Sequence, residues 1–506
     1  MSKTCIKPPL SVYTMSKSWV GLTGIFLFVL AIRLYFAFQT PFLSSDGAYL
    51  HVRYVETLLQ GKLLWHDPLG YGGRTLIQSP LFDAILAFFA FFMPLPLVLK
   101  IIPNIFASLL VIPAYLISYT LTKHRPISLF VALLASFVPA FFANTFNHAA
   151  PLTLALTLFF FLTYAWLRTP QRPWIIIFLS LLLIFVFLHP LSILFVLSIA
   201  VYIALAAIER LNPRLAEYEL GLFSIFFALW AQFLLYKKLI LFHGPSVIWQ
   251  NIPKELLSSF YASVTILGAI AQIGVFPLVD GTYALYKTAF KEPRKETLML
   301  LSITIVSAVM LWFKLIAIST GLMLLGITLA IVFGKSLIIS MRFIQETKFA
   351  SYAVPITIIT IISAFATTAY PAYTNAQSQL SNTITQEEVN SLAWLKNETP
   401  TDTTIIAPAS YGNYITTISK RKNVIDDYFL LQPSINERHQ DITRLYKTTF
   451  ETEAVELLDK YSATYIIVPP GIKDISYGNS PCFKRVQSTN IRIYEKNPEC
   501  KVKVVS

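Results

Sequence analysis

Long uninterrupted apolar runs constrain this chain more than any other feature of its sequence. Several of them, such as residues 98–121, reach the roughly 20 residues that an α-helix needs to cross a bilayer. Charged residues make up only 13% of the chain and hydrophobic residues 55%, whereas soluble proteins average about 25% charged residues. The sequence therefore predicts a polytopic α-helical membrane protein.

The basic residues lie in short clusters between the apolar runs, for example at 123–125 and 287–295. Because the net charge of +13 is not gathered into one patch, it fits the positive-inside rule and predicts no nucleic-acid partner. Placing these clusters in the cytoplasm gives about eleven spans. Residues 1–18 then form a cytoplasmic N-terminus, and residues 19–370 form the transmembrane domain of a multi-pass cell-membrane protein.

The same topology places a long polar segment, residues 39–79, on the extracytoplasmic face as the first outer loop. Residues 81–94 follow it and are apolar, but they are too few for a span. They predict a re-entrant or interfacial helix.

Residues 371–506 are polar and predict a soluble extracytoplasmic α/β domain. Helix-like stretches at 386–396 and 452–461 are interleaved with strand-like runs at 404–407 and 465–468. Cys482 and Cys500 in this domain are either joined in a disulfide, as an extracytoplasmic compartment permits, or two free thiols.

Asp46 lies in the first outer loop, just before an expected helix over residues 48–59. One interpretation is an N-cap, whose carboxylate meets the free N–H groups of the first helical turn. The other follows from the ionisable residues that crowd this loop beside the bilayer, where such groups usually have a function. A carboxylate there can act as a general base or hold a divalent cation against a phosphate.

Other polar residues on the outer face also have two interpretations. Asn147 and His148 either contribute metal ligands or belong to a simple turn between spans. Lys314 and Arg33 either pair with an anionic lipid head group or extend their charges to the interface.

Two segments carry a resemblance to a known family. Asp46-Gly-Ala-Tyr-Leu-His-Val-Arg53, followed by Asp67-Pro68, is similar to a first-loop pattern of Asp, aromatic and Arg, then Asp-Pro. Ser410-Tyr-Gly-Asn-Tyr-Ile415, followed by Arg421 and Asp426, is similar to a Trp-Trp-Asp-Tyr-Gly block and the strand after it. Together they resemble the catalytic subunit of oligosaccharyltransferase of the archaeal and bacterial type, within the GT-C glycosyltransferase superfamily.

The resemblance extends over most of the chain, but the motifs are degenerate. Residues 408–410 are Pro, Ala and Ser where the family block has Trp, Trp and Asp, and Ile266 stands in place of a motif Glu. Residues 144–148 occupy the place of the second acidic motif and contain no acid.

The resemblance implies a membrane glycosyltransferase. Such an enzyme moves a sugar or oligosaccharide from a polyprenyl-phosphate-linked donor in the lipid bilayer to an acceptor protein, glycan or lipid on the extracytoplasmic face. By this resemblance Asp46 is catalytic, and a divalent cation such as Mg²⁺ or Mn²⁺ is a cofactor. The implied binding residues are Lys314, Arg33 and Arg74 for the donor phosphate, Ser410, Tyr411 and Gly412 for the acceptor, and Asp46, Asn147 and His148 for the metal.

Two alternatives remain open from the sequence. Protein O-mannosyltransferases and lipid A aminoarabinose transferases also fit the minimum of one carboxylate on the first outer loop. The missing motif acids also fit a non-catalytic GT-C relative that binds lipid-linked glycans.

Overall fold

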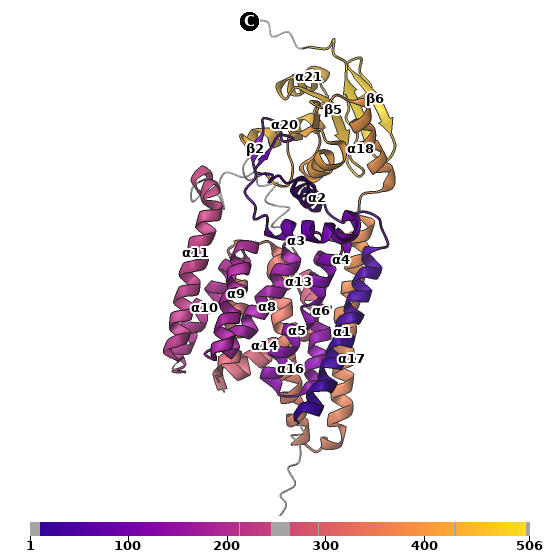
Figure 1. Ribbon diagram of the computed structural model, residues 1–506. Coiled ribbons are helices and arrows are strands. Elements are labelled where there is room, and N and C mark those ends of the chain that lie inside the picture. Colours follow the sequence, from indigo (N-terminus) through magenta and orange to yellow (C-terminus); the bar gives the residue numbers. More distant parts are fainter. Residues whose placement is uncertain (1–10, 212, 244–263, 292, 430–431, 502–506) are drawn as a thin grey trace, which may run out of the picture.

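The computed structural model describes residues 11–211, 213–243, 264–291, 293–429 and 432–501. A long helical bundle carries a smaller domain at one end, with the first outer loop between them (Figure 1). The bundle helices are α1 (Ser11–Ala37), α4 (Leu95–Ser108), α5 (Val111–Thr122), α6 (Arg125–Ser136), α7 (Pro139–Thr145), α8 (Leu152–Arg168), α9 (Arg172–Leu188), α10 (Leu191–Ile208), α11 (Leu215–His243), α13 (Ile266–Ile273), α14 (Val275–Lys291), α15 (Lys295–Trp312), α16 (Ile318–Gln345) and α17 (Ala353–Ser381).

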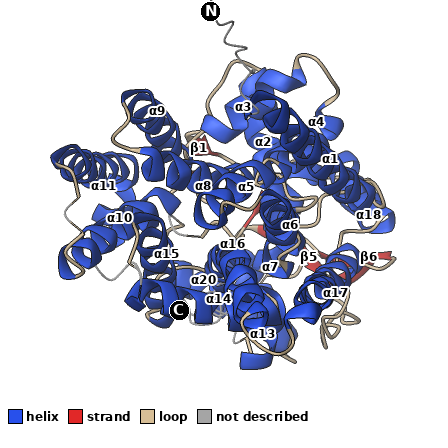
Figure 2. Ribbon diagram, turned by 90° about the horizontal axis from the view of Figure 1, so that it is seen from below, coloured by secondary structure: helices blue, strands red, loops and turns tan. Residues whose placement is uncertain are grey.

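The described helices confirm a multi-pass membrane protein. Seven spans are long and apolar enough to cross a membrane, or nine if each of two bent helix pairs is one span. α8 and α9 are apolar but only 17 residues long, so the predicted count of about eleven is reached only if both also cross. α16 lies near the centre of the bundle seen from below (Figure 2) and is the most buried candidate span. Residues 1–10 of the predicted cytoplasmic N-terminus lie outside the described residues.

The predicted span near residues 264–286 is broken rather than straight. α13 and α14 form a pair bent by 84°, and Gly274 between them has a φ of +100°, which residues with a side chain rarely adopt. A Cβ at this position would also lie 2.9 Å from Thr368 Oγ1. Glycine therefore permits both the sharp bend and the close approach of α17.

The first outer loop and the segment that follows it contain short elements that lie between the bundle and the C-terminal domain (Figure 1). These are α2 (Asp46–Leu59), β1 (His66–Asp67), β2 (Arg74–Thr75) and α3 (Leu81–Ala90). With ten residues, α3 is too short to span, as the sequence predicts. Lys100 of α4 donates hydrogen bonds to the carbonyl oxygens of Ala37 and Thr40, and so fixes the point where the loop leaves α1.

The C-terminal domain is built on a five-stranded sheet in the order β4-β3-β5-β7-β6. β3 runs parallel to β4 and β5, while β7 pairs antiparallel with β5 and β6. The predicted helices and strands are present, and the structure adds others. The elements are α18 (Gln386–Glu398), β3 (Thr404–Ile406), α19 (Gly412–Tyr414), β4 (Lys422–Asn423), α20 (Ile435–Lys447), α21 (Glu451–Lys460), β5 (Ala463–Val468), β6 (Phe483–Ser488) and β7 (Arg492–Lys496).

Two features of this domain bear on the sequence predictions. α17 continues without a break past residue 371 to Ser381, so the predicted boundary falls inside a helix that leads from the bundle into the domain. Cys482 and Cys500 are joined in a disulfide, which decides between the two alternatives that the sequence left open.

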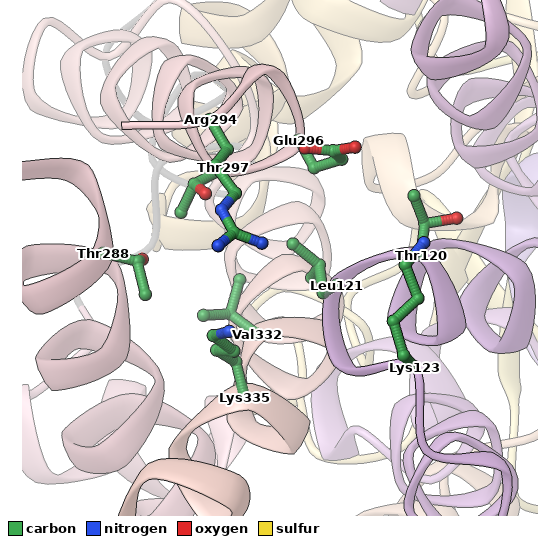
Figure 3. Close-up of a pocket in the computed structure, with 9 residues that line it drawn as sticks. All are labelled: Thr120, Leu121, Lys123, Thr288, Arg294, Glu296, Thr297, Val332 and Lys335. Atoms are coloured by element: carbon green, nitrogen blue, oxygen red, sulfur yellow. The ribbon is translucent and has the colours of Figure 1, made fainter. Parts of the chain in front are cut away.

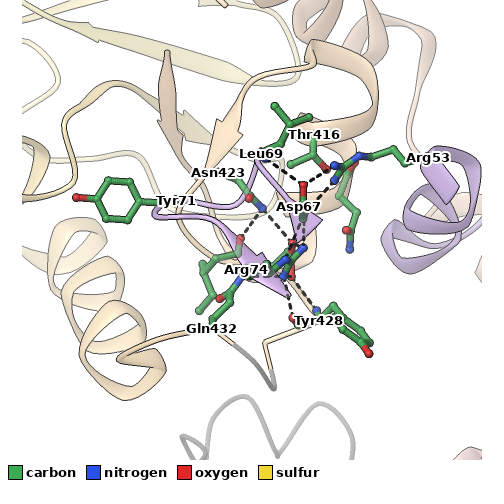
Figure 4. Close-up of polar contacts among 12 residues, drawn as sticks. Arg53, Asp67, Leu69, Tyr71, Arg74, Thr416, Asn423, Tyr428 and Gln432 are labelled. Carbon is green, nitrogen blue, oxygen red and sulfur yellow. Dashed lines mark hydrogen bonds and ion pairs between the residues drawn. The ribbon is translucent and has the colours of Figure 1, made fainter. Parts of the chain in front are cut away.

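Arg74 joins the first outer loop to the C-terminal domain through two buried carboxylates (Figure 4). Its guanidinium contacts Asp67 Oδ2 at 3.1 Å and Asp426 Oδ2 at 2.5 Å, and Arg53 Nη2 donates to Asp67 Oδ1 at 2.5 Å. Burial alone raises the pKa of Asp67, but Arg53 and Arg74 bring it below its ordinary value. The Arg and Asp-Pro elements of the first-loop pattern therefore have a structural role here.

We predict that Asp426→Ala destabilises the protein by about 3–5 kcal/mol, because it leaves Arg74 buried with less than its full counter-charge. Thermal and denaturant unfolding of the detergent-solubilised protein measures the loss. The control is Asp402→Ala, which removes an exposed carboxylate from an ion pair with Lys422 and is expected to cost about 0–1 kcal/mol. Equal effects of the two substitutions would contradict a stabilising role for the contact of Arg74 with Asp67 and Asp426.

Candidate functional site

Asp46 begins α2 and binds the C-terminal domain directly. Its Oδ2 accepts hydrogen bonds from the backbone N–H of Asn413 at 3.2 Å and from Asn413 Nδ2 at 2.8 Å, and its Oδ1 accepts from the Tyr414 N–H at 2.8 Å. The N-cap of α2 is Ser45, whose side chain accepts from the Ala48 N–H. The N-cap interpretation of Asp46 is therefore wrong: its carboxylate meets backbone N–H groups of another segment, 367 residues away in the chain.

Two cavities lie on either side of the start of α2. The bundle-side cavity, of about 460 Å³, reaches from His51 and Gln78 to the outer ends of α9 and α11 at Leu188 and Leu239. The domain-side cavity, of about 560 Å³, is lined by Asp46 and by polar residues of the C-terminal domain. Ser45 and Asp427 line both cavities, so these two residues form a shared wall.

Asp427 forms an acidic pair with Asp46. It remains accessible from the cavities that it lines, but the protein around it reduces its hydration, and together with the charge of Asp426 this raises its pKa to about 7. Burial raises the pKa of Asp46 well above its ordinary value, and the charge of Asp427 adds to this, against the hydrogen bonds from Tyr414 and Asn413. The pair is therefore poised to hold a proton or to attract a cation.

A histidine–aspartate dyad faces the bundle-side cavity. His51 Nδ1 lies 2.7 Å from Asp83 Oδ1, and Asp83 is fully buried. Gln78 Nε2 lies 3.2 Å from His51 Nδ1. His189 lines the same cavity, and burial, with a contribution from the charge of His51, lowers its pKa to about 4. Because Nδ1 of this neutral ring accepts from the Leu191 N–H, its own N–H is on Nε2.

The predicted acceptor residues divide into two groups. Ser410 and Tyr411 line the domain-side cavity, and the Tyr411 hydroxyl donates to Glu388 Oε1 at 2.8 Å. Gly412 does not line it: a Cβ there would lie 2.3 Å from Asp426 Cβ and 2.5 Å from the carbonyl oxygen of Ile425. Gly412 instead permits the close packing that presents the next two N–H groups to Asp46.

Asn147 and His148 lie against the residues just before Asp46. Asn147 Nδ2 donates to Ser44 Oγ at 2.7 Å, and His148 Nδ1 lies 3.2 Å from Ser45 Oγ. Asn147 Oδ1 and His148 Nε2 are buried without a hydrogen-bond partner, and burial lowers the pKa of His148 to about 4. Asn147 Oδ1 therefore keeps a lone pair available, and His148 Nε2 does so in the tautomer whose Nδ1 donates to Ser45 Oγ.

The three predicted donor-phosphate ligands are not brought together. Arg74 is paired with Asp67 and Asp426. Arg33 is buried in the bundle, where it donates to Asn104 Oδ1 and Thr145 Oγ1. Lys314 is exposed in the turn between α15 and α16 and lines neither cavity beside Asp46. The partners that hold Arg33 and Arg74 in place lie far away in the chain, so the sequence does not reveal them.

The residues around Asp46 fit a divalent cation that completes its coordination with a substrate. In the part of the chain that the structure describes, no three His, Cys, Asp or Glu side chains form a metal-binding group. The carboxylates of Asp46 and Asp427 are nevertheless ligands that suit Mg²⁺ or Mn²⁺, whereas Asn147 and His148 line neither of the cavities beside them. Mg²⁺ in particular is commonly held by one or two carboxylates and the phosphates of a substrate.

Sequence reasoning missed Asp427, the Asp83 partner of His51, and the roles of Asn413 and Tyr414. A signal existed for Asp83, because a single acid in the apolar run 81–94 is unusual. The pairing of Asp46 with residues 413 and 414 carries no such signal, since it depends on the fold.

Comparisons with known proteins support the fold. No family model matches the sequence, and no curated protein sequence matches it. The oligosaccharyltransferase AglB from Archaeoglobus fulgidus, solved with an inhibitory peptide and a dolichol-phosphate, matches with a TM-score of 0.66 and 14% identity, over 87% of this chain and 69% of its own. This chain has the GT-C glycosyltransferase fold.

Two further GT-C structures agree. ArnT from Cupriavidus metallidurans, bound to undecaprenyl phosphate, matches with a TM-score of 0.55 and 10% identity, over 94% of this chain and 99% of its own. The arabinofuranosyltransferase AftD from Mycobacteria has a TM-score of 0.56 and 13% identity, over 93% of this chain and 40% of its own. The archaeal oligosaccharyltransferase has also been solved with Zn and sulfate. The predicted resemblance is thereby confirmed as one of fold.

We predict that Asp427→Asn changes stability in a pH-dependent way. Because the pKa of Asp427 is raised to about 7 in the folded protein, from an ordinary value of 3.8, the folded state retains a proton that the unfolded chain has released. The contribution of Asp427 to stability therefore falls as pH rises from about 4 to about 7. The asparagine does not titrate, so the variant gains thermal stability relative to wild type across this range.

Thermal unfolding with EDTA between pH 4 and pH 8 measures this gain. Asp402→Asn, which changes an exposed carboxylate of the same domain, is the control and is expected to show a nearly constant difference from wild type. A constant difference for Asp427→Asn as well would contradict the prediction.

Proposed function

We propose that this protein transfers a sugar or oligosaccharide from a polyprenyl-phosphate-linked donor to an acceptor on the extracytoplasmic face. The observation that carries the proposal is the position of Asp46 and Asp427, where a cavity reaching the helical bundle meets a cavity facing the C-terminal domain. Dolichol-phosphate and undecaprenyl phosphate in similar solved structures support the donor class.

The donor head group occupies the bundle-side cavity. Its wall combines apolar side chains at the ends of α9 and α11 with the polar His51, Gln78 and His189, as a site for a phosphate on an apolar chain requires. The prenyl chain then remains among the helices, and the anomeric carbon lies at the shared wall.

The His51–Asp83 dyad stabilises the phosphate as it leaves. Asp83 orients the ring through Nδ1, so that the His51 imidazole lies beside the Nε2–H donor of His189 at the phosphate oxygens. These groups stabilise negative charge as the bond between the anomeric carbon and the phosphate oxygen breaks.

The acceptor enters the domain-side cavity, beside Ser410 and Tyr411. Asp46 accepts the proton of the attacking acceptor group while that group forms its bond to the anomeric carbon. The raised pKa of Asp46 makes it a stronger base than an ordinary carboxylate, and the hydrogen bonds from Asn413 and Tyr414 hold it in place.

A divalent cation is compatible with this arrangement. Asp46 and Asp427 are the residues that would hold Mg²⁺ or Mn²⁺. When bound, the cation would neutralise phosphate charge and polarise the acceptor.

The orientation follows from charge. Basic clusters at 123–125, 287–295 and 335–348 place those loops in the cytoplasm. The first outer loop and the C-terminal domain are then extracytoplasmic, and the N-terminus is cytoplasmic.

We predict that Asp46→Asn lowers sugar transfer by at least about 100-fold, because the amide accepts no proton. Purified protein with radiolabelled polyprenyl-phosphate sugars and membrane-extract acceptors, with and without EDTA, provides the assay. Asp402→Asn is the matched control and should retain activity. Donor binding without transfer by the wild type would instead identify a non-catalytic relative, and full transfer by Asp46→Asn would refute the role of Asp46.

We predict that His51→Gln and Asp83→Asn each lower kcat by about 10- to 100-fold with little change in the acceptor KM, because the dyad acts on the leaving phosphate. His66→Gln, which changes an exposed histidine of the same loop, is the control. An effect confined to the acceptor KM would contradict this role, because it would assign the dyad to acceptor binding.

A further inference from the structure

A basic cavity lies between helices at the end of the bundle away from the C-terminal domain (Figures 1 and 3). It has a volume of about 90 Å³ and is lined by residues at the ends of α5 and α15, by Val332 and Lys335 within α16, and by Thr288 of α14. Figure 3 shows the side chains of Arg294 and Lys335 pointing toward the same space, with Thr297 beside them. A volume of this size holds several waters or one phosphate group, since a single water needs about 10–15 Å³.

A second cavity of about 250 Å³ is lined by two of the same residues, Thr288 and Lys335. The described residues that line the two cavities include six cations and two acids, an excess of four positive charges. The cations are Lys123, Lys287, Lys291, Arg294, Lys335 and Arg342, and the acids are Glu296 and Glu346.

Lys335 lies between helices, level with the ends of α5 and α15. It precedes the end of α16 at Gln345 by ten residues, but Lys123 and Arg294 from the ends of the two neighbouring helices line the same cavity. An ionisable side chain held between membrane helices usually serves a function. The Thr297 hydroxyl lies in the same cavity, whereas the hydroxyls of Thr120 and Thr288 donate to the carbonyl oxygens of Leu116 and Ala284 within their own helices.

We propose that these two cavities bind the phosphate head group of an anionic membrane lipid in the leaflet at this end of the bundle. Clusters of Lys and Arg between membrane helices are the chemistry that recognises such head groups. The position at the ends of spanning helices favours a lipid over a soluble phosphate, because lipid head groups are concentrated there. The site lies at the opposite end of the bundle from Asp46, so it does not depend on the proposed function.

The test uses the full chain, purified in detergent and incorporated into nanodiscs that contain phosphatidylcholine with or without phosphatidylglycerol. Native mass spectrometry counts the retained lipids, and a titration of phosphatidylglycerol gives an apparent affinity. The wild type is expected to retain phosphatidylglycerol at least tenfold more strongly than phosphatidylcholine.

The variant pair Lys291→Gln with Arg342→Gln changes two exposed residues at the rim of the second cavity. It is expected to lose about 10- to 30-fold in affinity for phosphatidylglycerol. The control pair, Arg172→Gln with Lys348→Gln, removes the same charge from exposed positions that line neither cavity, and is expected to stay within about twofold of wild type.

Equal retention of the two lipids by the wild type, or an equal loss in the two variant pairs, would overturn the proposal. Inorganic phosphate and pyrophosphate are titrated in parallel, and displacement of the lipid by either at micromolar concentration would assign the site to a soluble phosphate instead. If the rim variants do not fold, the comparisons on the wild type still decide the outcome.

Discussion

The buried contact of Arg74 with Asp67 and Asp426 fixes the relation between the two parts of this molecule. The Arg74 guanidinium joins the first outer loop to Asp426, in the segment that follows β4. Because an unpaired charge at this depth is costly, the loop and the domain have one favoured arrangement. That arrangement places Asp46 against the N–H groups of residues 413 and 414, and Asp427 beside it. The geometry of the acidic pair therefore depends on a salt bridge whose Arg74 lines neither of the two cavities beside Asp46.

The acidic pair is costly for the protein to maintain. Both carboxylates have a raised pKa, through burial and neighbouring acidic charges, and such groups destabilise the folded state near neutral pH. Strain of this kind is typical of sites that act on a ligand, because a proton or cation supplied there relieves it. The neighbouring dyad of His51 and Asp83 follows the same pattern on the bundle side, where a buried carboxylate orients an imidazole.

The sequence predicts the coarse architecture well because that architecture follows from hydrophobicity. Apolar length predicts the bundle and the short helix α3, polar composition predicts the C-terminal domain, and two of its five strands, β3 and β5, follow from local pattern. The bend at Gly274 and the continuation of α17 past residue 371 depend on packing and were not predicted. Asp46 was identified from the crowding of charges around it, whereas the partners of Arg33 and Arg74 lie up to 352 residues away in the chain and could not be predicted.

The wall that the two cavities share has a consequence for solubility. Ser45 and Asp427 separate a chamber beside the apolar helices from a chamber beside the water-exposed domain. In the proposed reaction the lipid-linked donor and the water-soluble acceptor would stay in separate chambers. Only the sugar would pass the wall formed by Ser45 and Asp427. The fold would then keep the two substrates in separate environments while it catalyses the transfer.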